Sequence, residues 1–249
     1  MTVTQHVFFI ACVALSSYIQ NLTGFAFGLV LLGLVELLHL ASLHDATIAV
    51  SVLALVNAFV TFKSAKPTLD KVILKPTVLA GMAGVFGGVV LLNWLSDNAV
   101  AGLQFLLGLT ILACATMLFI RPTSLKTMSP ARSFAGVGFI AGIFGGLFST
   151  AGPPLVYHFY RQPLRTQQIR EHLIALFAIN AALRLVLLAA DGRIGLQAVL
   201  LSAEAAPVVI GMTWFMVRNP SKLPPQIIKR FVCVLLVIVG LVLCAKVGS

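Results

Sequence analysis

The chain of 249 residues is too apolar and too poor in charge to be a soluble domain. Hydrophobic residues make up 59% of it and charged residues only 10%, with a mean hydropathy of +1.04; a soluble domain is about a quarter charged. The net charge of +10 would suit a nucleic-acid-binding protein, but the positions of the charges fit membrane topology instead. Composition therefore predicts an all-α polytopic membrane protein that binds no nucleic acid.

Apolar runs of about twenty residues recur along the whole chain, long enough to cross a ~30 Å hydrocarbon core as helices. Most are unbroken rather than alternating, which argues against a β-barrel. The N-terminal stretch has no basic region and no small-residue cleavage site, so we expect no signal peptide. Eight segments are expected, at residues 6–39, 44–62, 72–95, 98–120, 132–162, 171–190, 194–217 and 226–247.

The same order of segments occurs in both halves of the chain. "LALVNAFVTF" (53–62) matches "LFAINAALRL" (176–185), which places Asn57 on Asn180. Upstream of each match lies a long segment with a polar, glycine-bearing break, "QNLTGFAFG" (20–28) and "STAGPP" (149–154). A broken segment followed by three continuous ones therefore occurs in residues 1–125 and again in 126–249, which predicts two repeats.

The lysines and arginines indicate how the segments cross. If all eight span, seven basic residues fall on each side. If each broken segment enters and leaves by one face, 14 basic residues share a face and only Arg193 and Lys246 lie opposite, as the positive-inside rule requires. Residues before 44 include no lysine or arginine, so symmetry alone extends this to the first segment. We expect six spans and two re-entrant hairpins with arms of about 14–17 residues, inverted repeats, cytoplasmic basic loops and periplasmic termini. The alternative for a broken segment is a tilted full span with a broken centre.

Helix breaks at membrane depth survive where the freed backbone lines a cavity. Helices restarting at Phe25 and Pro153 would point their N-termini, with free N–H groups and the positive end of the dipole, at an anion. Asn21, Thr23, Ser149 and Thr150 could cap these starts; the alternative is a kink that serves packing alone. The predicted substrate-binding residues at the breaks are Asn21, Thr23, Gly24, Phe25, Ser149, Thr150, Ala151, Gly152 and Pro153.

Four polar residues inside the spans extend this site. Asn57 and Asn180 either line the cavity or link helices by hydrogen bonds. Arg184 lies one turn after Asn180 and is a candidate anion ligand, although it is near enough to the helix end to snorkel. Glu204 is the candidate for proton coupling, and its depth, similar to that of Arg184, predicts that the two side chains pair or share the cavity.

Other chemistry is not indicated. Cys12, Cys114, Cys233 and Cys244 lie in apolar runs without metal-ligand spacing, so we expect them to serve packing. The glycines of "AGMAGVFGG" (80–88) are expected to allow close helix contact. We find no phosphate-binding loop, metal cluster or nucleophile motif. We therefore expect no cofactor, no metal, no catalytic residues and no enzyme activity.

The stretches "GFAFGLVLLGL" (24–34) and "GIFGGLFSTAGPPLVYHF" (142–159), in two four-segment halves that each open with a break, resemble the TauE/SafE family of sulfite exporters and related anion permeases. The resemblance covers essentially the whole chain. It implies transport of a small sulfur-containing or organic anion across a bacterial inner membrane. A secondary transporter is the leading interpretation, and a passive anion or small-solute channel is the alternative. The expected partners are a small anion and the lipid bilayer, with a homo-oligomer left open.

Overall fold

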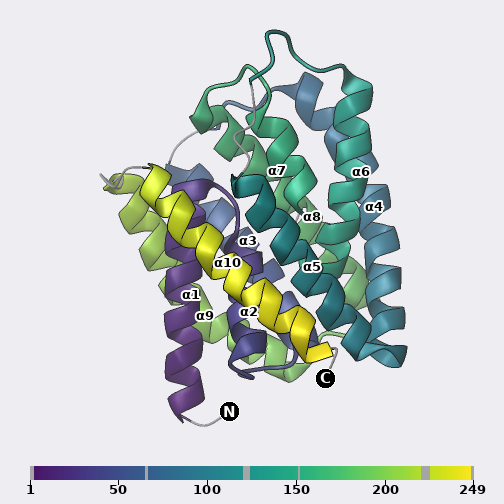
Figure 1. Cartoon of the computed structure of the whole chain (residues 1–249), viewed down its shortest axis with the longest axis vertical. Helices are drawn as coiled ribbons and strands as arrows, with labels where there is room; N and C mark the ends of the chain where they lie inside the picture. Colours follow the sequence, from purple (N-terminus) through teal and green to yellow (C-terminus); the bar gives the residue numbers. More distant parts are fainter. Residues whose placement is uncertain (1–2, 65–66, 120–123, 151, 220–224, 248–249) are drawn as a thin grey trace.

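A computed structural model describes residues 3–64, 67–119, 124–150, 152–219 and 225–247, and its regular structure there is entirely helical. The prediction of an all-α protein is confirmed. The helices of this part of the chain (Figure 1) are α1 Val3–Thr23, α2 Phe27–Leu37, α3 Leu43–Ser64, α4 Lys71–Asn98, α5 Val100–Phe119, α6 Ala131–Phe148, α7 Gly152–Tyr160, α8 Thr166–Ala190, α9 Leu196–Arg218 and α10 Pro225–Val247.

Seven of the described helices are long and apolar enough to cross a membrane: α1, α3, α4, α6, α8, α9 and the part of α5 from Val100 to Met117. Large hydrophobic side chains such as Phe59, Phe86 and Phe215 are exposed on the outside of the bundle. Such a surface suits lipid tails, which are as apolar as the side chains that meet them. The chain is a multi-pass membrane protein.

Two helix breaks interrupt the apolar segments, the first between α1 and α2 and the second between α6 and α7. Gly24 and Ala26 have φ angles of 82° and 78°, and Ser149 and Gly152 have 55° and 64°. Glycine adopts this left-handed region freely, which explains why a glycine stands at each break. The restarts fall at Phe27 and Gly152 rather than at Phe25 and Pro153.

The arms on either side of each break are unequal. They have 21 and 11 residues in the first broken segment and 18 and 9 in the second. The expected arms of about 14–17 residues are therefore wrong. In both segments the left-handed residues lie well past the segment's centre, so the first arm is long enough to span and the second is a half-helix.

Polar contacts define two ends of the bundle. At one end, the backbone N–H groups of Thr68 and Ser129 donate to Glu171 Oε2 (2.7 Å) and Gln162 Oε1 (3.0 Å), which ties the start of α4 to α8 and the start of α6 to the end of α7. We call this the basic end. His6 on α1 contacts Glu204 on α9, near the other end. The ends of α1 and α2 that lie away from their break are therefore both at that other end. The corresponding ends of α6 and α7 are both at the basic end (Figure 1).

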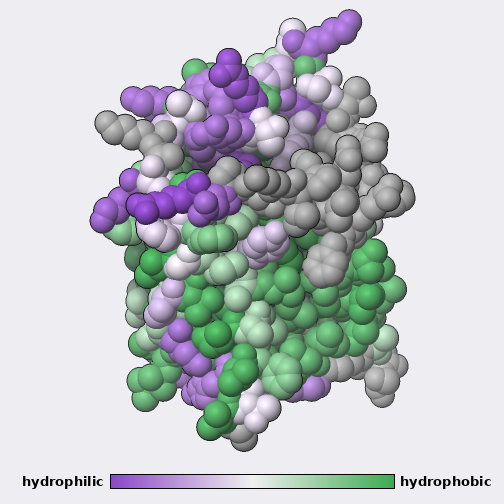
Figure 2. Space-filling model, turned by 90° about the vertical axis from the view of Figure 1, so that its left-hand side faces the viewer, coloured by the Kyte–Doolittle hydropathy of each residue, from purple (hydrophilic) through white to green (hydrophobic). Residues whose placement is uncertain are grey.

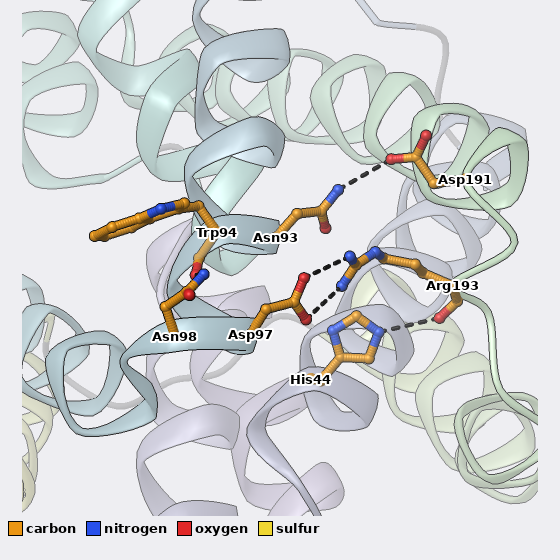
Figure 3. A network of polar contacts seen from close by, with 7 residues as sticks. All are labelled: His44, Asn93, Trp94, Asp97, Asn98, Asp191 and Arg193. Atoms are coloured by element: carbon orange, nitrogen blue, oxygen red, sulfur yellow. Dashed lines mark hydrogen bonds and ion pairs between the residues drawn. The ribbon is translucent and has the colours of Figure 1, made fainter.

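The other end, which we call the acidic end, is held by the network in Figure 3. Arg193 donates two hydrogen bonds to the carboxylate of Asp97 (3.0 and 2.7 Å), and Asn93 donates to Asp191 (3.0 Å). His44 Nε2 lies 3.0 Å from the carbonyl oxygen of Arg193. The network joins the end of α4, the α8–α9 connection and the start of α3. Ion pairs that are exposed to solvent in this way contribute little to stability.

Basic residues gather at the basic end. Nine lysines and arginines whose side chains the structure describes lie there: Lys63, Lys71, Lys75, Lys126, Arg132, Arg161, Arg165, Arg170 and Arg218. Arg193 lies at the acidic end. Figure 2 shows hydrophilic side chains gathered at the upper end of the molecule above a broad hydrophobic band, with a smaller hydrophilic group below it. This is the charge asymmetry of a membrane protein whose basic loops stay on one side.

The closest helix packing is that of α4 against α6. A Cβ on Gly84 would lie 2.1 Å from the carbonyl oxygen of Phe139, and one on Gly142 would lie 2.2 Å from that of Gly81. A Cβ on Gly88 would lie 2.3 Å from the carbonyl oxygen of Ile143. Real side chains do not approach backbone this closely, so only glycine fits. The packing role predicted for the glycines of 80–88 is confirmed for Gly81, Gly84 and Gly88.

We predict that Gly84→Ala destabilises the protein by about 1–3 kcal/mol, because the added methyl group overpacks a backbone contact. Gly87→Ala is the matched control, since a Cβ there has nothing within 4 Å. Thermal unfolding of the purified protein in detergent measures both. Equal melting temperatures for the two variants would contradict the observed packing of α4 and α6.

Candidate substrate-binding site

The two helix breaks approach each other inside the bundle. Gly28, in the first turn of α2, is buried, and a Cβ there would lie 3.3 Å from Cβ of Thr150 and 3.8 Å from the carbonyl oxygen of Ser149. Val50 of α3 closes the same contact at 3.0 Å. The N-terminal turn of α2 therefore abuts the second break, although more than 120 residues separate them in the sequence.

Side chains of α1 satisfy the backbone of the first break. Thr23 Oγ1 donates to the carbonyl oxygens of Ile19 (2.8 Å) and Phe25 (2.7 Å) as alternative acceptors, and Gln20 Oε1 accepts from the N–H of Phe27 (3.1 Å). All of these residues are buried. Gln20 thus accepts from the first N–H of α2, while Thr23 Oγ1 accepts from the N–H of Phe25, where the restart was expected (3.3 Å). The N–H groups of Gly28 and Leu29 follow in the first turn, where a helix provides no acceptor of its own.

The second break is built differently. Ser149 Oγ lies 2.8 Å from Ser51 Oγ, so Ser149 bonds to α3 rather than to the start of α7. Pro153 and Pro154 stand in the first turn of α7 and carry no N–H. Ala151 lies outside the described residues. The start of α7 therefore offers fewer backbone donors than the start of α2.

Arg184 is completely buried beside the second break. Its Nε donates to the carbonyl oxygen of Gly146 on α6 (2.7 Å), and Nη1 donates to the carbonyl oxygen of Thr47 (3.0 Å) and to Ser51 Oγ (2.8 Å) on α3. Nη2 donates to Thr47 Oγ1 (2.8 Å). Every one of these acceptors is neutral. Among the described residues no carboxylate lies within ion-pair distance of it, so the site holds an uncompensated positive charge.

A second arginine of α8 caps the other broken helix. Nη2 of Arg170 donates to the carbonyl oxygen of Asn21, and Tyr160 Oη donates to that of Thr23 (3.0 Å). Both acceptors belong to the last turn of α1, where carbonyls lack intrahelical partners and cations are favoured. Arg184 does the same for Gly146, near the end of α6. One helix, α8, thus supplies an arginine to the carbonyl end of each broken helix.

The two asparagines have different surroundings. Asn57 Oδ1 accepts from Thr213 Oγ1 of α9 (3.3 Å), which in turn accepts from Asn21 Nδ2 of α1 (3.3 Å). Asn57 thus joins a buried relay of three helices. Asn180 packs between glycines instead: a Cβ on Gly145 would lie 3.3 Å from its Nδ2, and one on Gly81 would lie 3.5 Å from its Oδ1. Asn180 therefore fills the seam between α4 and α6.

The expected pairing of Arg184 with Glu204 is wrong. Glu204 Oε2 lies 2.7 Å from Nδ1 of His6, with side chains 30% and 42% exposed, whereas Arg184 is fully buried and bonds to α3 and α6. Counting residues along a helix gives the depth of a side chain but not the face on which it lies. Arg184 and Glu204 lie at similar counts from their helix ends, but they face different neighbours.

Sequence reasoning missed the residues that hold Arg184 and cap α1. Thr47 and Ser51 lie one helical turn apart on α3, and hydroxyl groups four residues apart in an apolar helix are a signal of a buried polar stripe. The topology prediction used Arg170 only as one of the 14 basic residues on one face. Its place about four helical turns before Arg184, on nearly the same face of α8, could have suggested a shared role.

Comparison with known proteins agrees with the sequence pattern. The family model "Sulfite exporter TauE/SafE" matches residues 8–243, nearly the whole chain. The chain belongs to the TauE/SafE family. Members of this family are exporters, so the protein is a membrane transporter and not an enzyme. The resemblance inferred from the two broken segments is confirmed.

One curated TauE/SafE relative is similar along most of its length. The "Probable sulfite/organosulfonate exporter TauE" of Cupriavidus necator is 30% identical over 234 residues, which cover 92% of this chain and 90% of that protein. No solved structure matches the chain significantly.

We predict that Ser51→Ala destabilises the protein by about 1–3 kcal/mol, because it leaves a buried N–H of Arg184 without an acceptor. Ser64→Ala on the same helix is the control: Ser64 is exposed and bonds only to Val60 of its own helix, so its loss costs no more than about 0.5 kcal/mol. Thermal unfolding in detergent separates the two. A Ser51 variant as stable as the Ser64 variant would show that this contact contributes nothing.

Proposed function

We propose that the protein is a secondary transporter that moves a small sulfur-containing or organic anion, of the sulfite, sulfonate or carboxylate class, across the bacterial inner membrane. The single observation that carries this proposal is the uncompensated Arg184 beside two helix restarts. The relative named as a sulfite/organosulfonate exporter supports the substrate class. Such anions are small, hydrophilic and negatively charged at neutral pH, which matches an N–H-rich, positively charged site.

The half-helices support a site at the membrane midplane. At 1.5 Å per residue, the 11 residues of α2 and the 9 of α7 extend about 16 Å and about 14 Å. They run outward to opposite ends of the bundle, and their lengths together match a hydrocarbon core about 30 Å thick. Their N-termini thus meet halfway, in the arrangement by which discontinuous helices bind substrates in several secondary transporters.

In the proposed site the anion lies against the first turn of α2 and the second break. The N–H groups of Gly28 and Leu29 and the hydroxyl of Thr150 are the donors, and the dipole of α2 points its positive end at the anion. Arg184 contributes charge, reaching the break through Ser51 and Ser149. Four of its five N–H groups are engaged by the protein, so it acts mainly as a fixed cation.

The remaining predicted residues take supporting places in this proposal. Gly152 and Pro153 start α7, and Gly24 and Phe25 turn the chain beneath Arg170, since a Cβ on Gly24 would lie 2.7 Å from Cγ of Arg170. The relay of Asn21 and Asn57 lies on the α1 side of the site, and Asn180 lies on the α6 side. Thr23 stabilises the backbone of the first break, because its hydroxyl donates to the carbonyl oxygen of Phe25.

Helix pairing supports two inverted repeats, residues 1–125 and 126–249. Exchanging each helix of α1–α5 with its counterpart in α6–α10 turns the α4–α6 contact into α9–α1, α3–α9 into α8–α4, and α2–α10 into α7–α5. The pairs α3–α8 and α5–α10 map onto themselves. The two hairpins also open at opposite ends. By the positive-inside rule we place the basic end in the cytoplasm and both termini in the periplasm.

We propose that Glu204 and His6 together form the proton-coupling site. Both groups lie within helices that qualify as membrane spans, where ionisable residues are costly and are usually functional. Each is partly exposed, so a proton can reach the pair. No other charged group among the described residues is in ion-pair contact with either side chain.

We predict that Arg184→Gln lowers sulfite flux into proteoliposomes by about ten- to hundredfold, since one charge-assisted interaction is worth about 1.5–3 kcal/mol. Arg184→Lys keeps the charge and should retain more flux than Arg184→Gln. Arg132→Gln, which removes an exposed arginine at the start of α6, is the control and should transport normally. Gel filtration establishes that each variant is folded. Folded Arg184→Gln with normal flux would refute the role of this cation.

We predict that Glu204→Gln flattens the dependence of flux on an imposed proton gradient, because the amide cannot carry a proton. The wild type should concentrate sulfite or an organosulfonate when the gradient is applied. Flux that never exceeds equilibration, with or without the gradient, would instead identify a passive channel. A gradient response unchanged in Glu204→Gln would leave the His6–Glu204 contact a structural one.

A further inference from the structure

An open groove of about 970 Å³ runs between α3 and α9 at the basic end. Its walls are apolar and include Leu55, Val56, Phe59 and Trp214. Phe59 and Trp214 are 67% and 48% exposed, so the groove faces outward, away from the site between the half-helices. Both helices qualify as membrane spans, which places the walls of the groove against lipid tails.

Two cations stand at the mouth of this groove. Lys63 and Arg218 lie in the last turns of α3 and α9 and both line it. Arg218 lies over the ring of Trp214 at 4.0 Å, and Lys63 lies over that of Phe59 at 5.7 Å. Among the described residues neither has a carboxylate within ion-pair distance. The aromatic rings therefore position two cations without acidic partners at the mouth of the apolar groove.

We propose that this groove binds an anionic phospholipid of the leaflet at the basic end. An acyl chain occupies the apolar walls between Phe59 and Trp214, and the phosphate lies between Lys63 and Arg218. The two cations at the mouth complement the negative charge of the headgroup, and the apolar walls complement the acyl chain. A free anion would satisfy only the mouth, because it has nothing to place against the walls.

Charge argues against a second copy of the chain as the occupant. A symmetric dimer formed through this face would pair the same patch on both subunits. Lys63 and Arg218 of one copy would then approach the same residues of the other, and like charges brought together in an interface cost several kcal/mol. A lipid phosphate meets both cations without that repulsion.

Fluorescence of Trp214 tests the proposal directly. The chain has two tryptophans, so Trp94→Phe leaves Trp214 as the single reporter. This variant is reconstituted into vesicles that contain brominated phosphatidylglycerol among unlabelled phosphatidylcholine, and into vesicles with the label on phosphatidylcholine instead. Bromine quenches tryptophan on contact. Trp214→Phe is the matched control, because it leaves Trp94, which is exposed at the acidic end of α4.

Each cation near an anionic lipid is worth about fivefold in affinity, so Trp214 should prefer phosphatidylglycerol by roughly thirtyfold. The preference should fall about fivefold in Lys63→Gln or Arg218→Gln and vanish in the double variant, and Trp94 should show none. Equal quenching of Trp214 by both lipids would overturn the proposal. So would protection from both, which would indicate a protein neighbour, or relief of quenching by millimolar sulfite, which would make the groove a substrate path.

Discussion

The fold depends on how the carbonyl ends of two broken helices are satisfied inside an apolar bundle. A helix that stops at membrane depth leaves its last carbonyls without partners, and no water in the hydrocarbon core can replace them. Here the solution is the same twice: Arg170 donates to Asn21 at the end of α1, and Arg184 donates to Gly146 near the end of α6. Each cation also meets the negative end of a helix dipole.

Because both arginines belong to α8, the two breaks are fixed to one rigid element. The two arginines lie about four helical turns apart along α8, or about 21 Å. In the proposed site, the half-helices that follow, α2 and α7, point their N-termini at one anion. The carbonyl ends accept from Arg170, Tyr160 and Arg184, whereas the N-terminal turn of α2 abuts the second break. We propose that this contrast selects an anion: the carbonyl groups at the ends of α1 and α6 are occupied by donors, and the N–H groups at the start of α2 bind the substrate.

Much of the fold followed from sequence because it depends on local or summed properties. Apolar length predicted the helical segments, glycine predicted the breaks, and the lysines and arginines are gathered as one hairpin arrangement requires. The contacts of the site did not follow in the same way. Arg184 stood out in the sequence as a charge inside an apolar span, but its partners Thr47 and Ser51 come from α3, and His6 reaches Glu204 from the opposite repeat. Such contacts depend on the rotation of each helix about its axis, which spacing along one sequence does not determine.

The central claim, that an anion sits where the start of α2 meets the second break, is tested most directly by locating a bound anion. Selenite resembles sulfite in charge and shape, and selenium can be located by anomalous diffraction from crystals grown in lipid. We expect a selenium peak between Gly28 and Thr150, beside Arg184, that disappears when excess sulfite competes. A sulfite-sensitive peak elsewhere, for example between Lys63 and Arg218, or an empty site at saturating selenite, would contradict the account.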